Sequence, residues 1–197
     1  MRGAMQRDYY VWTRAPSERH PLLAWAQSSL AFRQGREVDT GEVVQLRLGE
    51  PMPLRPVMVD CHTLPAPVVS ERLADVLRSV PLPGVQLIPA DVQVEEGDVR
   101  RYTLVHMWRR LSVMDRERSV YRLAGSGIVL TGLDRLVLDE SVLRDVPLGE
   151  RLAFRLKEAV VHLVHASLVE RVLGLSPPPE GLRFIPLEAW DDSVAFR

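Results

Sequence analysis

The sequence predicts an α+β fold, mainly an antiparallel sheet with a few short helices, in which two similar strand–helix–strand units occur. Apolar and polar residues alternate along 85–94 and again along 100–115, which is the period of half-buried strands. A short amphipathic helix is expected just before the first of these strands. The phrase "GVQLIP" at 84–89 recurs as "GLRFIP" at 181–186, and the same number of residues separates these glycines from Ser70 and Ser167. Because solenoids need at least about three repeats, two copies predict one compact domain.

The composition is that of an ordinary soluble globular protein. Of the 197 residues, 46% are apolar and 26% are charged, and the net charge of −1 argues against a globally basic nucleic-acid-binding protein. No apolar run approaches the roughly 20 residues that span a bilayer, and charges interrupt the N-terminus, so we expect neither a membrane span nor a secretory signal. Cys61 is the single cysteine. This favours a reducing compartment, and the expected location is cytoplasmic.

Residues 1–65 are predicted to form an irregular N-terminal region. We expect a strand at 9–13, a short helix at 22–30, a strand at 43–48, a proline-rich connector at 49–56 and a short strand at 57–60. The periodicity is cleaner after residue 65. We therefore place a boundary there and predict an α+β domain over 66–197.

Within this domain, Ser70 is the predicted N-cap of a helix with an apolar stripe formed by Leu73, Val76, Leu77 and Val80. The strand at 85–94 and an acidic turn precede one long strand over 100–115, in which one face carries Tyr102, Leu104, His106, Trp108 and Arg110. Short strands are expected at 120–123, 128–131, 135–138 and 151–158, with a loop or a single helical turn at 139–150. The second unit is predicted as an apolar strand at 160–165, a helix with Ser167 as its N-cap and a closing strand.

Catalytic motifs are absent from the sequence. His162 and His165 have H-x-x-H spacing but lack the adjacent Glu of zinc hydrolases, and we interpret them as part-buried histidines. Cys61 and His62 are adjacent and cannot pair directly in a strand, so the thiol is interpreted as structural. The "GSG" at 125–127 predicts a hairpin turn because it lacks the context of a phosphate-binding loop. We therefore expect no enzyme activity, no metal and no cofactor.

The densest basic stretch runs from Arg100 to Arg118. With Tyr102 and Trp108 it would suit nucleic acid, so a nucleic-acid-binding accessory protein is the alternative function. Acidic residues lie within this stretch and just upstream. We interpret the stretch as a sheet with solvated or ion-paired arginines and expect no nucleic-acid partner.

Protein binding is the class of function that remains. Trp, Tyr and Arg carry much of the energy of protein interfaces, and acidic groups attract a positively charged partner. The candidate binding residues are Glu95, Glu96, Asp98, Trp108, Arg109, Arg110, Trp190, Asp191 and Asp192.

Several phrases occur in the order seen in one bacterial family. They are "VVSERLADVL", "GVQLIPADV", "WRRLSVMDRERS", "LVLDESVL", "LAFRLKE" and "SLVERVLGL…EGLRFIPLE". Together they resemble the immunity proteins of polymorphic toxin systems, a family named after a myxobacterial toxin–immunity locus and formerly a domain of unknown function. The resemblance covers residues 57–188, and "HASLVER" departs from the family's usual "VSER" phrase.

The resemblance implies a small cytosolic protein, made by the toxin-producing cell and its kin, that neutralises one cognate toxin by stoichiometric binding. The toxin would be encoded nearby, and the candidate residues above would contact it. If the toxin is a nuclease, the acidic candidates would occupy its phosphate-binding cleft. The family has no catalytic residue to transfer.

Overall fold

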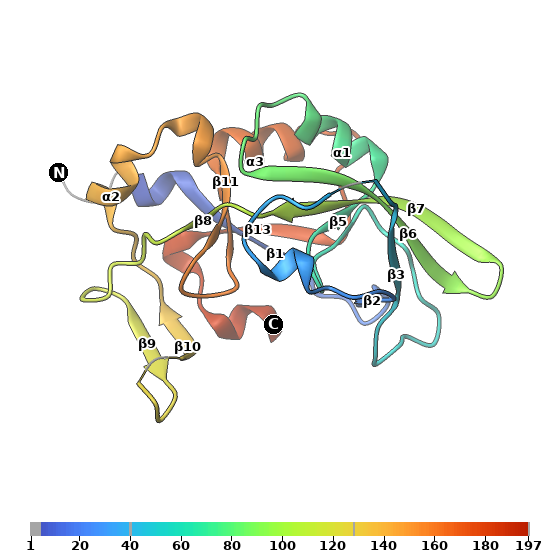
Figure 1. Cartoon of the computed structure of the whole chain (residues 1–197), viewed down its shortest axis with the longest axis horizontal. Coiled ribbons are helices and arrows are strands. Elements are labelled where there is room, and N and C mark those ends of the chain that lie inside the picture. The colour runs from blue at the N-terminus through green and yellow to red at the C-terminus, as the bar shows by residue number, and fades with distance from the viewer. Residues whose placement is uncertain (1–4, 40, 128, 197) are drawn as a thin grey trace.

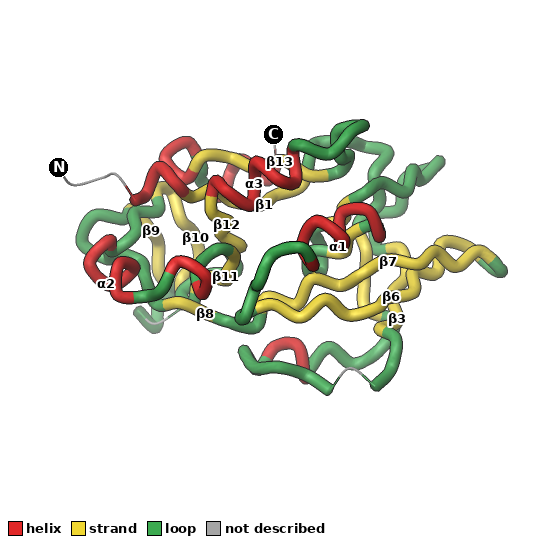
Figure 2. The backbone as a smooth tube through the Cα atoms, turned by 90° about the horizontal axis from the view of Figure 1, so that it is seen from above, coloured by secondary structure: helices red, strands yellow, loops and turns green. Residues whose placement is uncertain are grey.

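The computed structural model describes residues 5–39, 41–127 and 129–196. Its strands form a six-stranded sheet, a five-stranded sheet and a separate two-stranded hairpin (Figure 1). Helices α1 and α3 pack against each other over the two larger sheets (Figure 2). The fold is therefore α+β with mainly antiparallel sheets, as the sequence predicts.

The six-stranded sheet has the order β2-β3-β6-β7-β5-β4. Its strands are β2 (Leu23–Trp25), β3 (Val44–Leu48), β4 (Cys61–His62), β5 (Val68–Val69), β6 (Val85–Glu95) and β7 (Asp98–Met107). Strands β3 and β6 pair in parallel, whereas the other neighbours are antiparallel. The long β6–β7 hairpin extends to the right-hand end of the molecule in Figure 1.

The five-stranded sheet has the order β13-β1-β12-β11-β8. Its strands are β1 (Tyr9–Arg14), β8 (Arg110–Leu111), β11 (Ala153–Leu156), β12 (His162–His165) and β13 (Leu182–Pro186). The separate hairpin consists of β9 (Val120–Leu123) and β10 (Leu130–Arg135). The helices are α1 (Glu71–Arg78), α2 (Glu140–Asp145) and α3 (Ala166–Leu173). Short 3-10 turns occupy Met5–Asp8, Ala31–Arg33, Leu148–Glu150, Leu187–Ala189 and Asp192–Phe196.

The two predicted strand–helix–strand units have the same topology. In the first unit, β5 and β6 flank α1 in sequence, and both pair antiparallel with β7, which lies between them. In the second unit, β12 and β13 flank α3 and both pair antiparallel with β1. Each helix thus connects two strands that are separated by one antiparallel strand, and the repeated phrase marks an architectural repeat.

Only one of the two helices has the N-cap serine that the equal spacing predicts. Ser70 is the N-cap residue of α1, as predicted, but its hydroxyl donates to Asp60 and makes no capping hydrogen bond. In the second unit the N-cap is His165, whose Nδ1 accepts from the backbone N–H of Ser167 at 3.2 Å, so the Ser167 prediction is wrong. An imidazole nitrogen replaces the hydroxyl oxygen as the acceptor that the first turn requires. The equivalent buried triads are then Leu73, Ala74, Leu77 and Leu168, Val169, Val172.

The long strand predicted over 100–115 is in fact divided between the two sheets. Strand β7 ends at Met107, and after Trp108 the chain enters the five-stranded sheet as β8. Arg109 joins the sheets, because its N–H donates to the carbonyl of Gly84 and its carbonyl accepts from Arg155, both at 3.1 Å. The alternating pattern of residue types does not reveal this step, because the pattern continues across it while the burial does not follow it: β7 buries all five residues from Thr103 to Met107.

The N-terminal third contains two wrong predictions. The helix expected at 22–30 is replaced by β2, in which Leu23 pairs with Leu48, and by an irregular stretch that leads into the 3-10 turn at Ala31–Arg33. The strand expected at 57–60 is irregular, and pairing begins at Cys61 instead. Partners from distant strands override the weak local helical spacing at 22–30. The strands at 9–14 and 44–48 form as predicted.

Other boundaries shift by a few residues. Strand β10 replaces the strands predicted at 128–131 and 135–138; Ile128 lies outside the described residues, and Leu138 makes only an isolated bridge to Met114. The segment at 139–150 contains α2, capped by Asp139, whose carboxylate accepts from two backbone N–H groups. The strands at 120–123 and 153–156 match their predictions closely.

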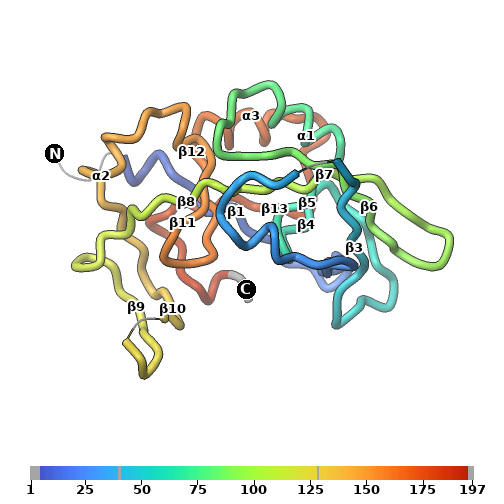
Figure 3. The backbone as a smooth tube through the Cα atoms, in the orientation of Figure 1, coloured from blue at the N-terminus to red at the C-terminus, as the bar shows by residue number. Residues whose placement is uncertain are grey.

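The boundary near residue 65 stays a prediction. The chain before it supplies β1 to the five-stranded sheet, between β13 and β12, and β2, β3 and β4 to the six-stranded sheet, as the blue-to-cyan trace in Figure 3 shows. Three buried clusters hold these layers together. The middle cluster lies under α1 and α3 and includes Trp12 of β1 together with Leu73 and Leu168. The N-terminal third is therefore packed into the core of both sheets.

The carboxylate of Asp60 connects the two units. It accepts from Arg72 of α1 at 2.8 and 2.6 Å, from the Ser70 hydroxyl at 2.7 Å and from the Glu180 N–H at 3.0 Å. Arg72 also donates to the carbonyl of Pro177 at 2.8 Å. The Arg72 guanidinium is the main cause that lowers the pKa of Asp60 to about 2. The start of α1 is thereby fastened to the turn that precedes β13.

We expect Asp60→Asn to lower the free energy of unfolding by about 2 kcal/mol, because a neutral amide loses the charge-assisted bonds to Arg72. Urea unfolding measures the change. Asp98→Asn is the matched control, because Asp98 also binds one arginine through both oxygens but lies at an exposed hairpin tip. An exposed pair contributes at most about 1 kcal/mol, so similar losses in the two variants would contradict the role of Asp60.

Candidate functional site

The predicted binding residues lie in three separate places. Glu95, Glu96 and Asp98 are at the tip of the β6–β7 hairpin, and residues 108–110 are at the step between the sheets. Residues 190–192 lie near the C-terminus, remote from the hairpin tip (Figure 1). The structure does not bring the nine candidates together into one surface.

At the hairpin tip, Glu95 and Glu96 are exposed. Asp98 differs, because Arg100 donates to its two carboxylate oxygens at 2.6 and 2.8 Å. The same guanidinium lowers the pKa of Asp98. The tip therefore presents two outward carboxylates, and the charge of Asp98 is balanced by its neighbour.

The C-terminal candidates have structural roles. Trp190 is 8% exposed and packs in the cluster under β1 and β11. Asp192 accepts from the N–H of Leu133 at 2.6 Å and so connects the C-terminal turn to β10. Asp191 accepts from the N–H of Ser193 at 2.8 Å. Trp190 thus has little surface to offer a partner.

At the step between the sheets, Trp108 and Arg109 contact each other. The Arg109 guanidinium lies 5.7 Å from the centroid of the Trp108 ring and forms a 2.7 Å ion pair with Glu150. Arg110 instead donates to the carbonyl of Arg33 at 2.6 Å. These side chains brace the junction of the sheets.

The basic stretch from Arg100 to Arg118 does not form a uniform cationic face. Four of its arginines are ion-paired, in the pairs Arg100–Asp98, Arg101–Asp91, Arg109–Glu150 and Arg118–Asp115. Arg110 lines a pocket at the junction of the two sheets. This agrees with the interpretation of solvated or ion-paired arginines, and no observation favours the nucleic-acid alternative.

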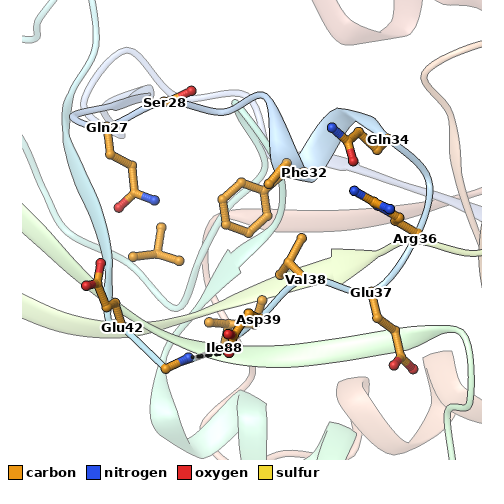
Figure 4. Close-up of a pocket in the computed structure, with 13 residues that line it drawn as sticks. Gln27, Ser28, Phe32, Gln34, Arg36, Glu37, Val38, Asp39, Glu42 and Ile88 are labelled. Carbon is orange, nitrogen blue, oxygen red and sulfur yellow. Dashed lines mark hydrogen bonds between the residues drawn. The ribbon is translucent and has the colours of Figure 1, made fainter.

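A cavity of about 730 Å³ lies beside the segment 27–42 and over β6 (Figure 4). Phe32 forms one wall and Ile88 of β6 contributes apolar surface, whereas Glu37, Asp39 and Glu42 lie around it. Gln86 of β6 holds the segment in place, because its amide exchanges hydrogen bonds of 2.9 and 3.0 Å with the backbone of Val38. Sequence reasoning missed this cavity. Its residues lie in a polar stretch without motif or period, and contacts with residues distant in sequence, such as the pairing of Gln86 with Val38, place that stretch over the sheet.

Cys61 and the histidines His62 and His165 have structural roles. Cys61 is 1% exposed, and burial raises the pKa of its thiol to about 12, so it is protonated at neutral pH and a poor nucleophile. His165 caps α3, and His62 donates or accepts in two backbone contacts. Among the described residues, no three His, Cys, Asp or Glu side chains are arranged to hold a metal ion. Within the same residues, no helix has the length and apolar character needed to cross a bilayer.

Comparison with models of protein families identifies a match for this chain. The family model described as "Immunity protein family (Imm11)" matches residues 30–189. A search of curated proteins found no match. The matched region begins before the predicted boundary at 65 and includes most of the segment beside the cavity, both helices α1 and α3, and the step between the sheets. Because the match spans most of the chain, the protein belongs to the Imm11 immunity protein family.

Proposed function

We propose that this protein neutralises a cognate toxin in the cytoplasm by direct, stoichiometric binding, without catalysis, and that the toxin is encoded nearby. Membership of the immunity protein family carries the proposal. The buried, protonated thiol of Cys61 and the structural roles of the histidines support a binding function. Inhibition would come from covering the active site of the toxin or holding it in an inactive arrangement.

The surface that we assign to the toxin is the outer part of the six-stranded sheet. The β6–β7 tip presents Glu95 and Glu96, and Glu37, Asp39 and Glu42 surround the cavity over β6. Both acidic groups adjoin strands of the six-stranded sheet, one at the β6–β7 turn and the other in the segment before β3. Such acidic surfaces capture positively charged partners rapidly. If the toxin is a nuclease, these carboxylates would occupy its phosphate-binding cleft.

Co-expression with the polypeptide encoded beside this chain tests the function. We expect the two proteins to co-purify in a 1:1 complex and growth to be rescued from the toxicity of that polypeptide. A complex with rescue supports neutralisation by binding. If no complex forms and growth is not rescued, the proposal is refuted.

Charge reversal at the hairpin tip tests the surface. We expect Glu95→Lys with Glu96→Lys to slow association with the toxin by about tenfold at low salt, because the electrostatic attraction is lost. Stopped-flow association at several salt concentrations measures the effect, which should shrink as salt rises. Glu117→Lys with Glu170→Lys is the control, since these exposed residues undergo the same charge change away from the six-stranded sheet. Equal rates for the two double variants would contradict this surface.

A further inference from the structure

A second cavity, of about 420 Å³, lies where the two sheets meet. Trp25 and Phe32 form an aromatic wall, in which the rings stack with centroids 4.9 Å apart. Arg33, Arg110 and Arg155 contribute positive charge, and among the described residues that line the cavity there is no Asp or Glu. In a protein with a net charge of −1, a purely basic cavity is unexpected.

The two central arginines are neighbours without a shared carboxylate. Arg110 of β8 and Arg155 of β11 are paired in register, which places two cations side by side. Arg110 donates one bond to the carbonyl of Arg33, but the Nε atoms of Arg110 and Arg155 are buried without an acceptor. Burial and the positive charge of Arg110 together lower the pKa of Arg155. Two part-buried cations without a carboxylate between them repel each other, so this arrangement is costly unless an anion completes it.

The histidines of the cavity do not supply the missing partner. His106 directs Nε2 to the carbonyl of Arg36 at 3.0 Å, which requires that nitrogen to donate. Burial, followed by the charges of Arg110 and Arg155, lowers the pKa of His106. Burial and Arg155 lower the pKa of His162 to about 4. At neutral pH both imidazoles are therefore uncharged, and Arg33, Arg110 and Arg155 set the charge of the cavity.

We propose that this cavity is a binding site for an oxyanion, a phosphate or a carboxylate, carried on an aromatic or apolar body. The guanidinium groups of Arg110 and Arg155 bind the oxyanion, because their planar donors suit two-oxygen groups. Trp25 and Phe32 contact the body of the ligand. The oxyanion comes either from a free small molecule or from an acidic side chain of the toxin. The cavity itself does not depend on the proposed immunity function.

Calorimetric titration of the purified protein with phenyl phosphate and inorganic phosphate, at constant ionic strength in chloride, tests the site. We expect both to bind and phenyl phosphate to bind more tightly, because it also contacts the aromatic wall. Arg155→Met, which keeps the apolar stem, should weaken binding by at least about tenfold. Arg110→Met should act similarly. Arg101→Met is the matched control, because Arg101 lies on the six-stranded sheet with a side chain 93% exposed, and it should leave binding unchanged.

Thermal unfolding without added anion separates a binding role from a structural one. If the two arginines form an anion site, Arg155→Met removes the repulsion between Arg110 and Arg155. The thermal midpoint of this variant should then equal or exceed that of the wild-type protein. Phosphate should raise the midpoint of the wild-type protein but not of the variant. A variant that is less stable than wild type, together with absence of phenyl phosphate and phosphate binding by the wild-type protein, overturns the proposal.

The source of the anion is distinguished in the complex. Release of bound phenyl phosphate when the toxin is added identifies an acidic side chain of the toxin as the natural ligand. Retention of phenyl phosphate in the complex identifies a free small anion. If no toxin complex forms, the proposed function fails while the titration of the isolated protein still decides the site.

Discussion

Gly181→Ala is expected to lower the free energy of unfolding by about 3 kcal/mol or more. Gly181 has a φ of +87°, which L side chains rarely adopt, and an added Cβ would lie 2.2 Å from the carbonyl oxygen of Cys61 and 2.5 Å from Cγ2 of Val59. The backbone here is fixed on two sides, because Ala15 donates to the carbonyl of Gly181 and Cys61 donates to that of Glu180. The chain therefore cannot move away to relieve the clash. Urea unfolding gives the change in free energy.

Gly97→Ala is the matched control for this variant. Gly97 has a similar φ of +83°, but an added Cβ would meet no atom within 4 Å. The left-handed backbone alone should cost about 1 kcal/mol. The difference between the two variants measures the close approach of the chains at Gly181. Equal losses would show that the clash is relieved and would refute the expected role of this crossing.

The close approach of another segment at Gly181 also explains why the phrase is repeated. Gly84, the first residue of the earlier copy, lies where an added Cβ would be 2.4 Å from Cβ of Arg109. Both glycines thus allow another segment to cross directly over the start of the closing strand. The repetition records a common packing requirement of the two units, and the binding chemistry lies elsewhere in the molecule.

Stability is expected to fall as the pH is lowered from 7 to 4. His62 is 3% exposed; its Nδ1 is 3.0 Å from the carbonyl of Pro21, and its Nε2 accepts from the N–H of Val59. Burial is the main cause that lowers its pKa to about 4. Because the unfolded histidine titrates near 6.5, the unfolded state binds more protons between these values, and stability rises with pH there. His62 alone should account for about 3 kcal/mol between pH 7 and a pH just below 4.

Urea unfolding at pH 7, 6, 5 and 4 measures this dependence. His162, whose pKa burial also lowers to about 4, adds to the loss in the same interval. Asp60 does not, because its stabilisation is lost only as the pH falls from its ordinary pKa of 3.8 towards about 2. In His62→Gln the amide can still donate and accept but does not titrate, so the slope between pH 6.5 and 4 should become clearly smaller. An unchanged slope, or a wild-type stability that is constant down to pH 5, would contradict the neutral buried state of His62.

The predicted binding residues illustrate the limits of a sequence without structure. Residue type identifies Trp190 as a typical interface residue, yet it is buried among residues of β1 and β11. Glu95 and Glu96 are exposed because a two-stranded hairpin must turn there, which the acidic "EEGD" phrase indicates locally. Arg155 carries no local signal. Its register with Arg110 joins strands that are distant in sequence, and the basic cavity exists only through that pairing.

The sequence by itself determined the features that depend on local period and turn chemistry. These are the α+β class, the helix after Ser70, the strand at 85–94 and the repeated strand–helix–strand unit, in which a glycine precedes the last strand. Tertiary structure alone decided the step between the sheets after Trp108, the strand at 23–25 and the two cavities. The physical reason is that strand pairing and burial draw their free energy from partners far away in sequence. Local propensities are too weak to oppose those partners. A segment whose pattern is compatible with either helix or strand therefore adopts the one that its tertiary partners stabilise.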